Sequence, residues 1–95
     1  KKPNSMSLQI LEKNEIFYLN GEININTVNF FDSFFETVNH KKITLNIDKV
    51  ILIDKKGLEV LFKFMQNIKK NNKIFVILGY GCKEIYDHFR QTNVA

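Results

Sequence analysis

The chain has little of several residue types: one cysteine, one proline, a single arginine and no tryptophan in 95 residues. The lone Cys82 has no partner for an internal disulfide, which fits a reducing compartment such as the cytoplasm. No apolar run approaches the roughly 18 residues that a membrane-spanning helix requires, and the longest is Ile74–Leu78. No charged segment followed by an apolar one marks a secretory signal. These absences predict one cytoplasmic domain with a single small core.

The formal net charge is +4, which raises the question of nucleic-acid binding. The lysines, however, are scattered in pairs near the ends of expected elements, and arginine appears only at Arg90. Base readers and phosphate clamps usually need arginine or a dense basic face. The charge therefore favours a solvated surface over a nucleic-acid interface.

Residues that could carry chemistry are few and dispersed. His40 and His88 lie far apart in sequence, each without an acidic partner at a telling spacing. Cys82 and His88 would point to different faces of one short helix, so Cys82 is expected in the core. No clustered ligands predict a metal site. The Gly79-Tyr80-Gly81 segment lacks the third glycine of a dinucleotide loop, since Glu84 stands there. The sequence predicts no enzyme and no cofactor.

The first third of the chain reads as paired strands. Leu8–Leu11 and Ile16–Leu19 predict an antiparallel pair around a turn at Lys13-Asn14. Asn20-Gly21 predicts a second turn, because glycine adopts positive φ without strain. Apolar residues alternate with polar ones over Ile43–Ile47, which predicts a strand with one buried face. Helices are therefore expected on one side of the sheet only.

A helix is predicted from about Asn26 to Asn39, capped by Asn24 or Asn26. It is rich in phenylalanine, and at about 100° per residue not all of these rings can face inward. The three that fit the core-facing side are Phe31, Phe34 and Phe35. Phe30 falls near the edge of this face, where an exposed aromatic could anchor an interface.

The second half of the chain predicts strand, helix, strand and helix. Val50–Ile53 reads as a short buried strand, and Asp54 as the N-cap of a helix running to about Lys70. The apolar stripe of that helix is Leu58, Leu61, Phe62, Met65 and Ile68. Ile74–Leu78 is expected to be a central parallel strand. A short last helix would carry Cys82, Ile85, Tyr86 and Phe89, with Arg90 in its final turn.

The segment Asp54-Lys55-Lys56-Gly57-Leu58 resembles the Asp-Ser-Ser-Gly-Leu turn of STAS domains. Gly21-Glu22-Ile23 resembles the Gly-x-hydrophobic end of the second strand in that family. The order of elements also fits over about residues 7–94, within one domain spanning 1–95. The resemblance implies an α/β sandwich with a mixed, mostly parallel sheet of about four strands and three or four helices.

In STAS domains a Ser or Thr between the Asp and the Gly is phosphorylated to switch binding. Lys55 and Lys56 occupy both positions here, so the resemblance predicts no phosphorylation at this turn. The hydroxyls of Ser33, Thr37 and Thr44 are not at the equivalent place. Two lysines in a first helical turn oppose the helix dipole, yet they create an electropositive tip suited to a carboxylate or phosphate on a partner.

The resemblance places partner binding on this turn and the helix that follows it. Val60 and Phe64 lie off the apolar stripe, so they form either a wider core-facing surface or an apolar patch with a charged rim of Lys56, Glu59 and Lys63. The candidate partner-binding residues are Asp54, Lys55, Lys56, Gly57, Val60 and Phe64.

Two functions fit the resemblance. One is a divergent anti-sigma factor antagonist that binds an anti-sigma kinase or a similar regulator without a phosphorylation switch. The other is a transport-associated STAS domain, either a cytoplasmic subunit of a phospholipid-trafficking ABC transporter at the inner membrane or part of a permease. Transport domains often lack the phosphorylatable Ser, and the start at Lys1 and end at Ala95 favour a fragment. Both functions imply a protein partner, and self-association stays open.

Overall fold

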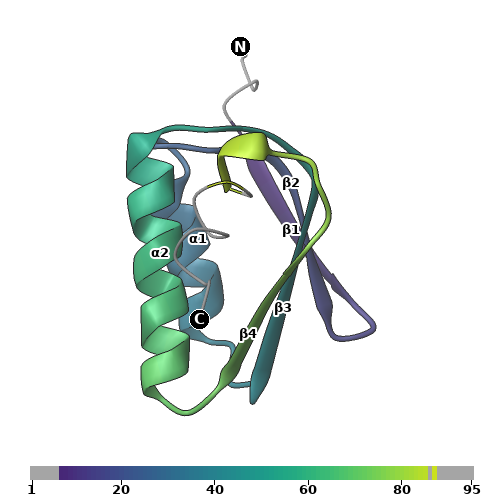
Figure 1. Ribbon diagram of the computed structural model, residues 1–95, viewed down its shortest axis with the longest axis vertical. Coiled ribbons are helices and arrows are strands. Elements are labelled where there is room, and N and C mark those ends of the chain that lie inside the picture. Colours follow the sequence, from purple (N-terminus) through teal and green to yellow (C-terminus); the bar gives the residue numbers. More distant parts are fainter. Residues whose placement is uncertain (1–6, 86, 88–95) are drawn as a thin grey trace.

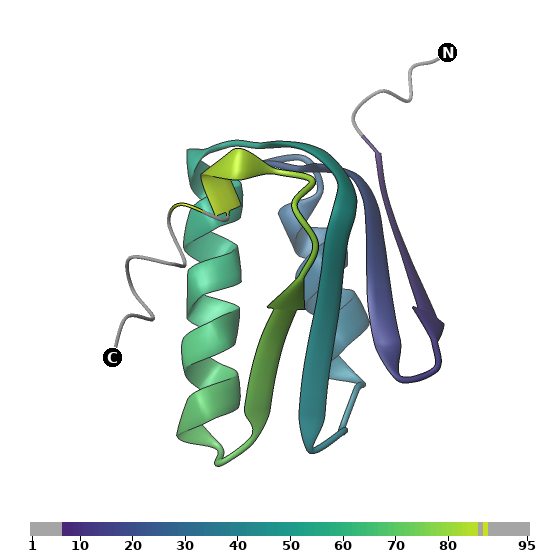
Figure 2. The same ribbon diagram turned by 45° about the vertical axis from the view of Figure 1, so that its right-hand side comes forward.

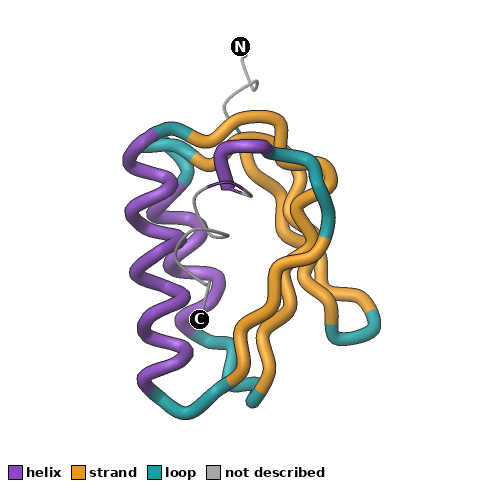
Figure 3. Tube along the Cα trace, in the orientation of Figure 1, coloured by secondary structure: helices purple, strands orange, loops and turns teal. Residues whose placement is uncertain are grey.

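The computed structural model describes residues 7–85 and 87 (Figure 1). Its labelled elements are β1 (Leu8–Lys13), β2 (Ile16–Ile23), α1 (Val28–Glu36), β3 (Lys42–Ile53), α2 (Lys55–Lys70) and β4 (Ile74–Leu78). A further helical turn follows β4 at residues 83–85 and includes Asp87. The predicted order of strands and helices is confirmed, as the tube in Figure 3 shows.

The four strands form one sheet in the order β1-β2-β3-β4. β1 runs antiparallel to β2, whereas β2, β3 and β4 are parallel to one another. Figures 1 and 2 show both α1 and α2 on the same side of this sheet, with the last helical turn above the gap between α2 and the strands. This arrangement confirms the α/β fold with a mixed, mostly parallel sheet. In the part of the chain that the structure describes, α1 and α2 cover one face of the sheet, as predicted.

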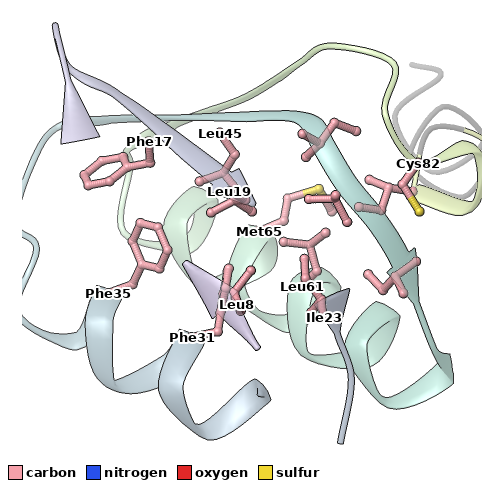
Figure 4. Close-up of a cluster of buried hydrophobic side chains, with 14 of the residues drawn as sticks. Leu8, Phe17, Leu19, Ile23, Phe31, Phe35, Leu45, Leu61, Met65 and Cys82 are labelled. Atoms are coloured by element: carbon pink, nitrogen blue, oxygen red, sulfur yellow. The ribbon is translucent and has the colours of Figure 1, made fainter. Parts of the chain in front are cut away.

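The hydrophobic core lies between that face and the two long helices (Figure 4). Alternate side chains of β2 and β3 point toward the helices, which is the pattern of a sheet with one covered face. Central core residues include Phe17, Leu19, Ile23, Leu45, Phe31, Phe35, Leu61 and Met65. Phe17 lies 5.0 Å from Phe35 between ring centroids, in an edge-to-face contact that favours both rings.

The phenylalanines of α1 divide as the helical periodicity predicted. Phe31 and Phe35 are buried, Phe34 is half-buried, and Phe30 is 46% exposed. Phe30 contacts this aromatic cluster through Phe34, at 6.2 Å between centroids. It therefore remains available as an exposed aromatic on the outer side of α1.

The predicted turn at Asn20-Gly21 is wrong, because β2 continues through it to Ile23. Gly21 has φ +124° and lies where the pairing of β2 with β3 changes register. A Cβ atom on Gly21 would overlap the carbonyl oxygen of Ser7. The glycine thus serves a strand irregularity rather than a chain reversal.

The caps proposed for the first helix are also wrong. α1 begins at Val28 after Thr27, which occupies the N-cap position without a side-chain capping bond. Asn24 instead organises the preceding loop, since its backbone carbonyl accepts from the amides of Thr27 and Val28, each at 2.9 Å. The helix ends at Glu36, earlier than the predicted Asn39.

Two interpretations of burial need correction. Val50–Ile53 is the end of the long strand β3 rather than a short buried strand, and Ile51 is 72% exposed. Val50 and Ile53 are buried on the helix-covered face, whereas Ile51 and Leu52 are exposed, so only part of this segment faces the core. β4 itself is an edge strand within the described residues, not a central one, and Ile74 is 58% exposed.

The last helix is described only in its first turn. Cys82 and Ile85 are buried in the core, as their spacing predicted. The predictions for Tyr86, His88, Phe89 and Arg90 lie outside the described residues.

Candidate partner-binding surface

The turn between β3 and α2 is built around the carboxylate of Asp54. Its Oδ1 accepts a hydrogen bond from the amide of Gly57 at 2.7 Å, which confirms Asp54 as the N-cap of α2. Its Oδ2 accepts from the amide of Ile25 at 3.2 Å. One side chain therefore holds the start of α2 and the loop between β2 and α1 together.

Gly57 lies where the first turn of α2 packs against the end of β2. The amide of Asp54 donates to the carbonyl oxygen of Ile23 at 3.1 Å, which fixes the turn against that strand. A Cβ atom on Gly57 would overlap the same carbonyl oxygen and lie 2.7 Å from Cγ1 of Ile53. Glycine at this position is thus required by space, while its φ is unremarkable for a helix.

Lys55 and Lys56 are the first two residues of α2, and both are exposed. Lys56 forms an ion pair with Glu59 of its own helix, at 3.6 Å between Nζ and Oε1. Within residues 7–85 and 87, Lys55 makes no ion pair. The two ammonium groups add positive charge at the N-terminal end of α2, where the carboxylates of Asp54 and Glu59 also lie.

Val60 and Phe64 lie along a groove of about 480 Å³ between α1 and α2. Phe64 is half-buried, and its ring contacts Phe31 at 5.2 Å and Phe35 at 4.8 Å between centroids. These two residues therefore belong to the wall between the helices, and part of each remains accessible from the groove. Lys56 and Lys63 border them on the α2 side.

Five of the six candidate residues are accessible at least in part at the turn or along α2, whereas Gly57 is buried against β2 and cannot contact a partner itself. What sequence reasoning missed is the opposite wall, where α1 contributes Asp32 and Glu36. Their spacing of one helical turn on the polar side of α1 was the available signal. The bond from Ile25 to Asp54 joins residues far apart in the chain and left no such signal.

The hydroxyl groups considered above lie away from the turn. Ser33 is exposed on α1, Thr44 is buried on β3, and Thr37 donates its hydroxyl to the carbonyl oxygen of Phe34 at the end of α1.

His40 does have an acidic partner, contrary to the reading of the sequence. Its Nε2 lies 2.8 Å from Oε2 of Glu12, and its ring is 5.7 Å from that of Phe17. The hairpin of β1 and β2 brings Glu12 beside the segment that precedes β3, which linear spacing does not show.

Among the described residues no group of three or more potential ligands could hold a metal ion. In the same residues, no helix is long and apolar enough to cross a membrane.

We expect Cys82 to resist thiol reagents while the protein is folded. Burial raises the pKa of its thiol, and the side chain is only 3% exposed. A raised pKa lowers the thiolate fraction at any pH below it, and the thiolate is the reactive form. At pH 8 a chromogenic disulfide reagent should react at least tenfold more slowly with the native protein than in concentrated urea. Equal rates in the two conditions would contradict the buried placement.

Asp54→Ala is expected to lower the free energy of unfolding by about 0.5–2 kcal/mol, the range measured for loss of an N-cap. Asp54→Asn should cost less, because the amide oxygen of asparagine can still accept the hydrogen bond from Gly57. The bond from Ile25 would be lost, since the NH₂ group of asparagine cannot accept it. Urea unfolding of both variants measures the difference. An alanine variant as stable as wild type would show that the cap contributes nothing.

Comparisons with known proteins agree with this geometry. The family model described as STAS domain matches residues 5–95. The chain belongs to the STAS domain family. Among solved structures, the Bacillus cell fate determinant SpoIIAA in its phosphorylated form is similar, with a TM-score of 0.71 and 15% sequence identity. The match covers 93% of this chain and 85% of that one.

The anti-sigma factor antagonist SpoIIAA in its unphosphorylated form is similar too, at a TM-score of 0.58 and 14% identity, covering 92% of this chain and 81% of that chain. No curated protein matches the sequence. At these identities the solved structures show a shared fold, and they confirm the STAS sandwich that the Asp54 turn implied. In this STAS domain the turn carries Lys55 and Lys56 between Asp54 and Gly57.

Proposed function

We propose that this STAS domain is a non-enzymatic protein-interaction module, similar to an anti-sigma factor antagonist, whose binding is not switched by phosphorylation at the Asp54 turn. The partner is an anti-sigma kinase-like regulator that contacts the turn and α2. The fold similarity to SpoIIAA, an anti-sigma factor antagonist solved in phosphorylated and unphosphorylated forms, supports the regulatory role.

The proposal rests on the Asp54 turn, which has the Asp and the Gly of the STAS turn but carries lysines between them. Asp54 caps α2 and Gly57 allows the close approach to β2, so the local backbone is preserved as a platform. The two residues between them are exposed lysines instead of hydroxyl-bearing residues. A permanent positive charge stands where phosphorylation would add negative charge, which favours a partner with a carboxylate or phosphate at the contact.

A kinase assay tests the absence of the switch. We expect no phosphate on the wild-type domain after incubation with ATP and an anti-sigma kinase of the family. The matched control is the variant Lys55→Ser with Lys56→Ser, which restores hydroxyls at the turn and should become a substrate if the kinase recognises the fold. Phosphate on Ser33 or Thr37 of the wild type, with changed partner affinity, would show that the switch lies elsewhere.

A transport-associated STAS domain is the second candidate, favoured by the same lysines because such domains often lack the phosphorylatable Ser. In that case the partner is the cytoplasmic part of a phospholipid-trafficking ABC transporter or a permease. Co-purification with transporter subunits encoded beside this chain would support it, and co-purification with a kinase-like regulator would support the first candidate.

A further inference from the structure

The groove between α1 and α2 has walls of opposite charge above an apolar floor. The floor is lined by Val28, Val60 and Phe64. Asp32 and Glu36 stand on the α1 wall, one helical turn apart, and both are exposed. Figure 1 shows α1 and α2 on the same face of the sheet, and the groove is lined by residues within 28–36 and 56–67 of these helices.

The α2 wall carries Lys56 and Lys63, and both are exposed. Among the described residues no ion pair crosses the groove. Within residues 7–85 and 87, Asp32, Glu36 and Lys63 make no ion pair, and Lys56 pairs only with Glu59 on its own helix. The two rows of charge are therefore separated by the groove and are not neutralised across it, so each can pair with an incoming molecule.

We propose that this groove binds an amphipathic helix of the partner protein. The apolar side of that helix would meet Val60 and Phe64, a basic flank would face Asp32 and Glu36, and an acidic flank would face Lys56 and Lys63. An apolar stripe laid between two helices is a common mode of peptide recognition, and opposed charges fix its orientation. The inference rests on the proposed interaction function and adds α1 to the binding surface.

The arrangement of charges favours a helix over other occupants. An anionic lipid surface and a nucleic acid each present negative charge, so either would be repelled by the acidic α1 wall. A second copy of this chain would place its own concave groove against this one, so the apolar floors of both grooves would stay uncovered. Lys56 and Lys63 are two turns apart, roughly 10 Å along the axis. A partner helix of about three turns would reach both.

The proposed separation of basic and acidic flanks on the partner helix can be tested with two synthetic peptides. The first peptide is a capped helix with leucines along one side, lysines on one flank and glutamates on the other. The second has the same composition, with lysine and glutamate mixed on both flanks. In a ¹⁵N NMR titration we expect the polarised peptide to bind at least tenfold more tightly. Its amide shifts should be confined to 28–36 and 56–67. Equal affinities, shifts on the open sheet face, or no shifts at millimolar peptide would overturn the proposal.

Charge reversal of one wall gives the second measurement. Asp32→Lys with Glu36→Lys makes both walls basic and should weaken the polarised peptide at least tenfold. The control, Glu15→Lys with Glu84→Lys, changes the net charge equally at exposed positions outside the groove lining and should bind as wild type does. Thermal melting verifies that both variants are folded. Unchanged affinity of the groove variant would overturn the proposal.

The natural partner separates this proposal from the broader function. If that partner loses affinity for Lys55→Glu, which lies outside the groove lining, but not for the groove variant, the groove inference fails and the proposed function stands. If the peptide binds the groove while no protein partner requires the turn, the groove inference stands and the proposed function fails.

Discussion

Replacing Gly57 with valine is expected to lower the free energy of unfolding by about 3 kcal/mol or more, the range of severe overpacking. The added Cβ would overlap the carbonyl oxygen of Ile23 and crowd Cγ1 of Ile53. A backbone carbonyl cannot move as a flexible side chain can, so the start of α2 would have to shift away from β2. For a domain of this size the melting temperature should fall by on the order of 15 °C.

Gln66→Val supplies the matched control, because it places the same β-branched residue at an exposed position of the same helix. Its cost should stay within about 0.7 kcal/mol, the range of helix propensity. Urea and thermal unfolding of the two variants measure the difference. A Gly57 variant that melts with the control would show that α2 does not need this close approach.

Lys55→Glu combined with Lys56→Glu is expected to weaken binding to the natural partner at least tenfold, on the order of 1.4 kcal/mol. The double variant reverses the charge of the exposed tip where the turn meets a partner. Stability should barely change. Glutamate in a first helical turn favours the dipole by a few tenths of a kcal/mol, whereas the variant also replaces the Lys56–Glu59 pair with two like charges.

Calorimetric titration against the protein encoded beside this chain measures that loss, with thermal melting to verify folding. Lys41→Glu with Lys42→Glu is the control, since it makes the same charge change at the start of β3, and should bind as wild type does. Binding of the wild type should also weaken as salt rises, because exposed charges are screened. Equal affinity of wild type and tip variant would remove the turn from the interface. The surfaces of Phe30 or Phe64 would then be the next to test.

The sequence predicted the Asp54 turn well because the interactions that form this turn join residues close together in the chain. An Asp that caps a helix acts on an amide within the next turn, and the Asp54–Gly57 bond is of this kind. Helical periodicity similarly separated Phe31 and Phe35 from Phe30, since each helix buries one side. The family resemblance followed from the same turn.

Predictions failed where a residue's role depends on its neighbours across the sheet. Gly21 has the signature of a turn, but pairing with both β1 and β3 keeps it within a strand. The apolar run of β4 suggested a central strand, yet only β3 lies beside it in the described residues. Composition records how apolar a segment is, and does not record how many neighbours cover it.

The sequence by itself determined the STAS fold, the cap at Asp54 and the lysines at the turn, because periodicity, capping and residue identity act over a few neighbouring positions. Only the tertiary structure decided that the Asp54 carboxylate also holds Ile25, that Glu12 meets His40, and that acidic α1 faces basic α2 across an apolar groove. Those contacts join segments whose separation along the chain carries no local pattern. They exist only once the sheet has placed its connecting loops and helices side by side.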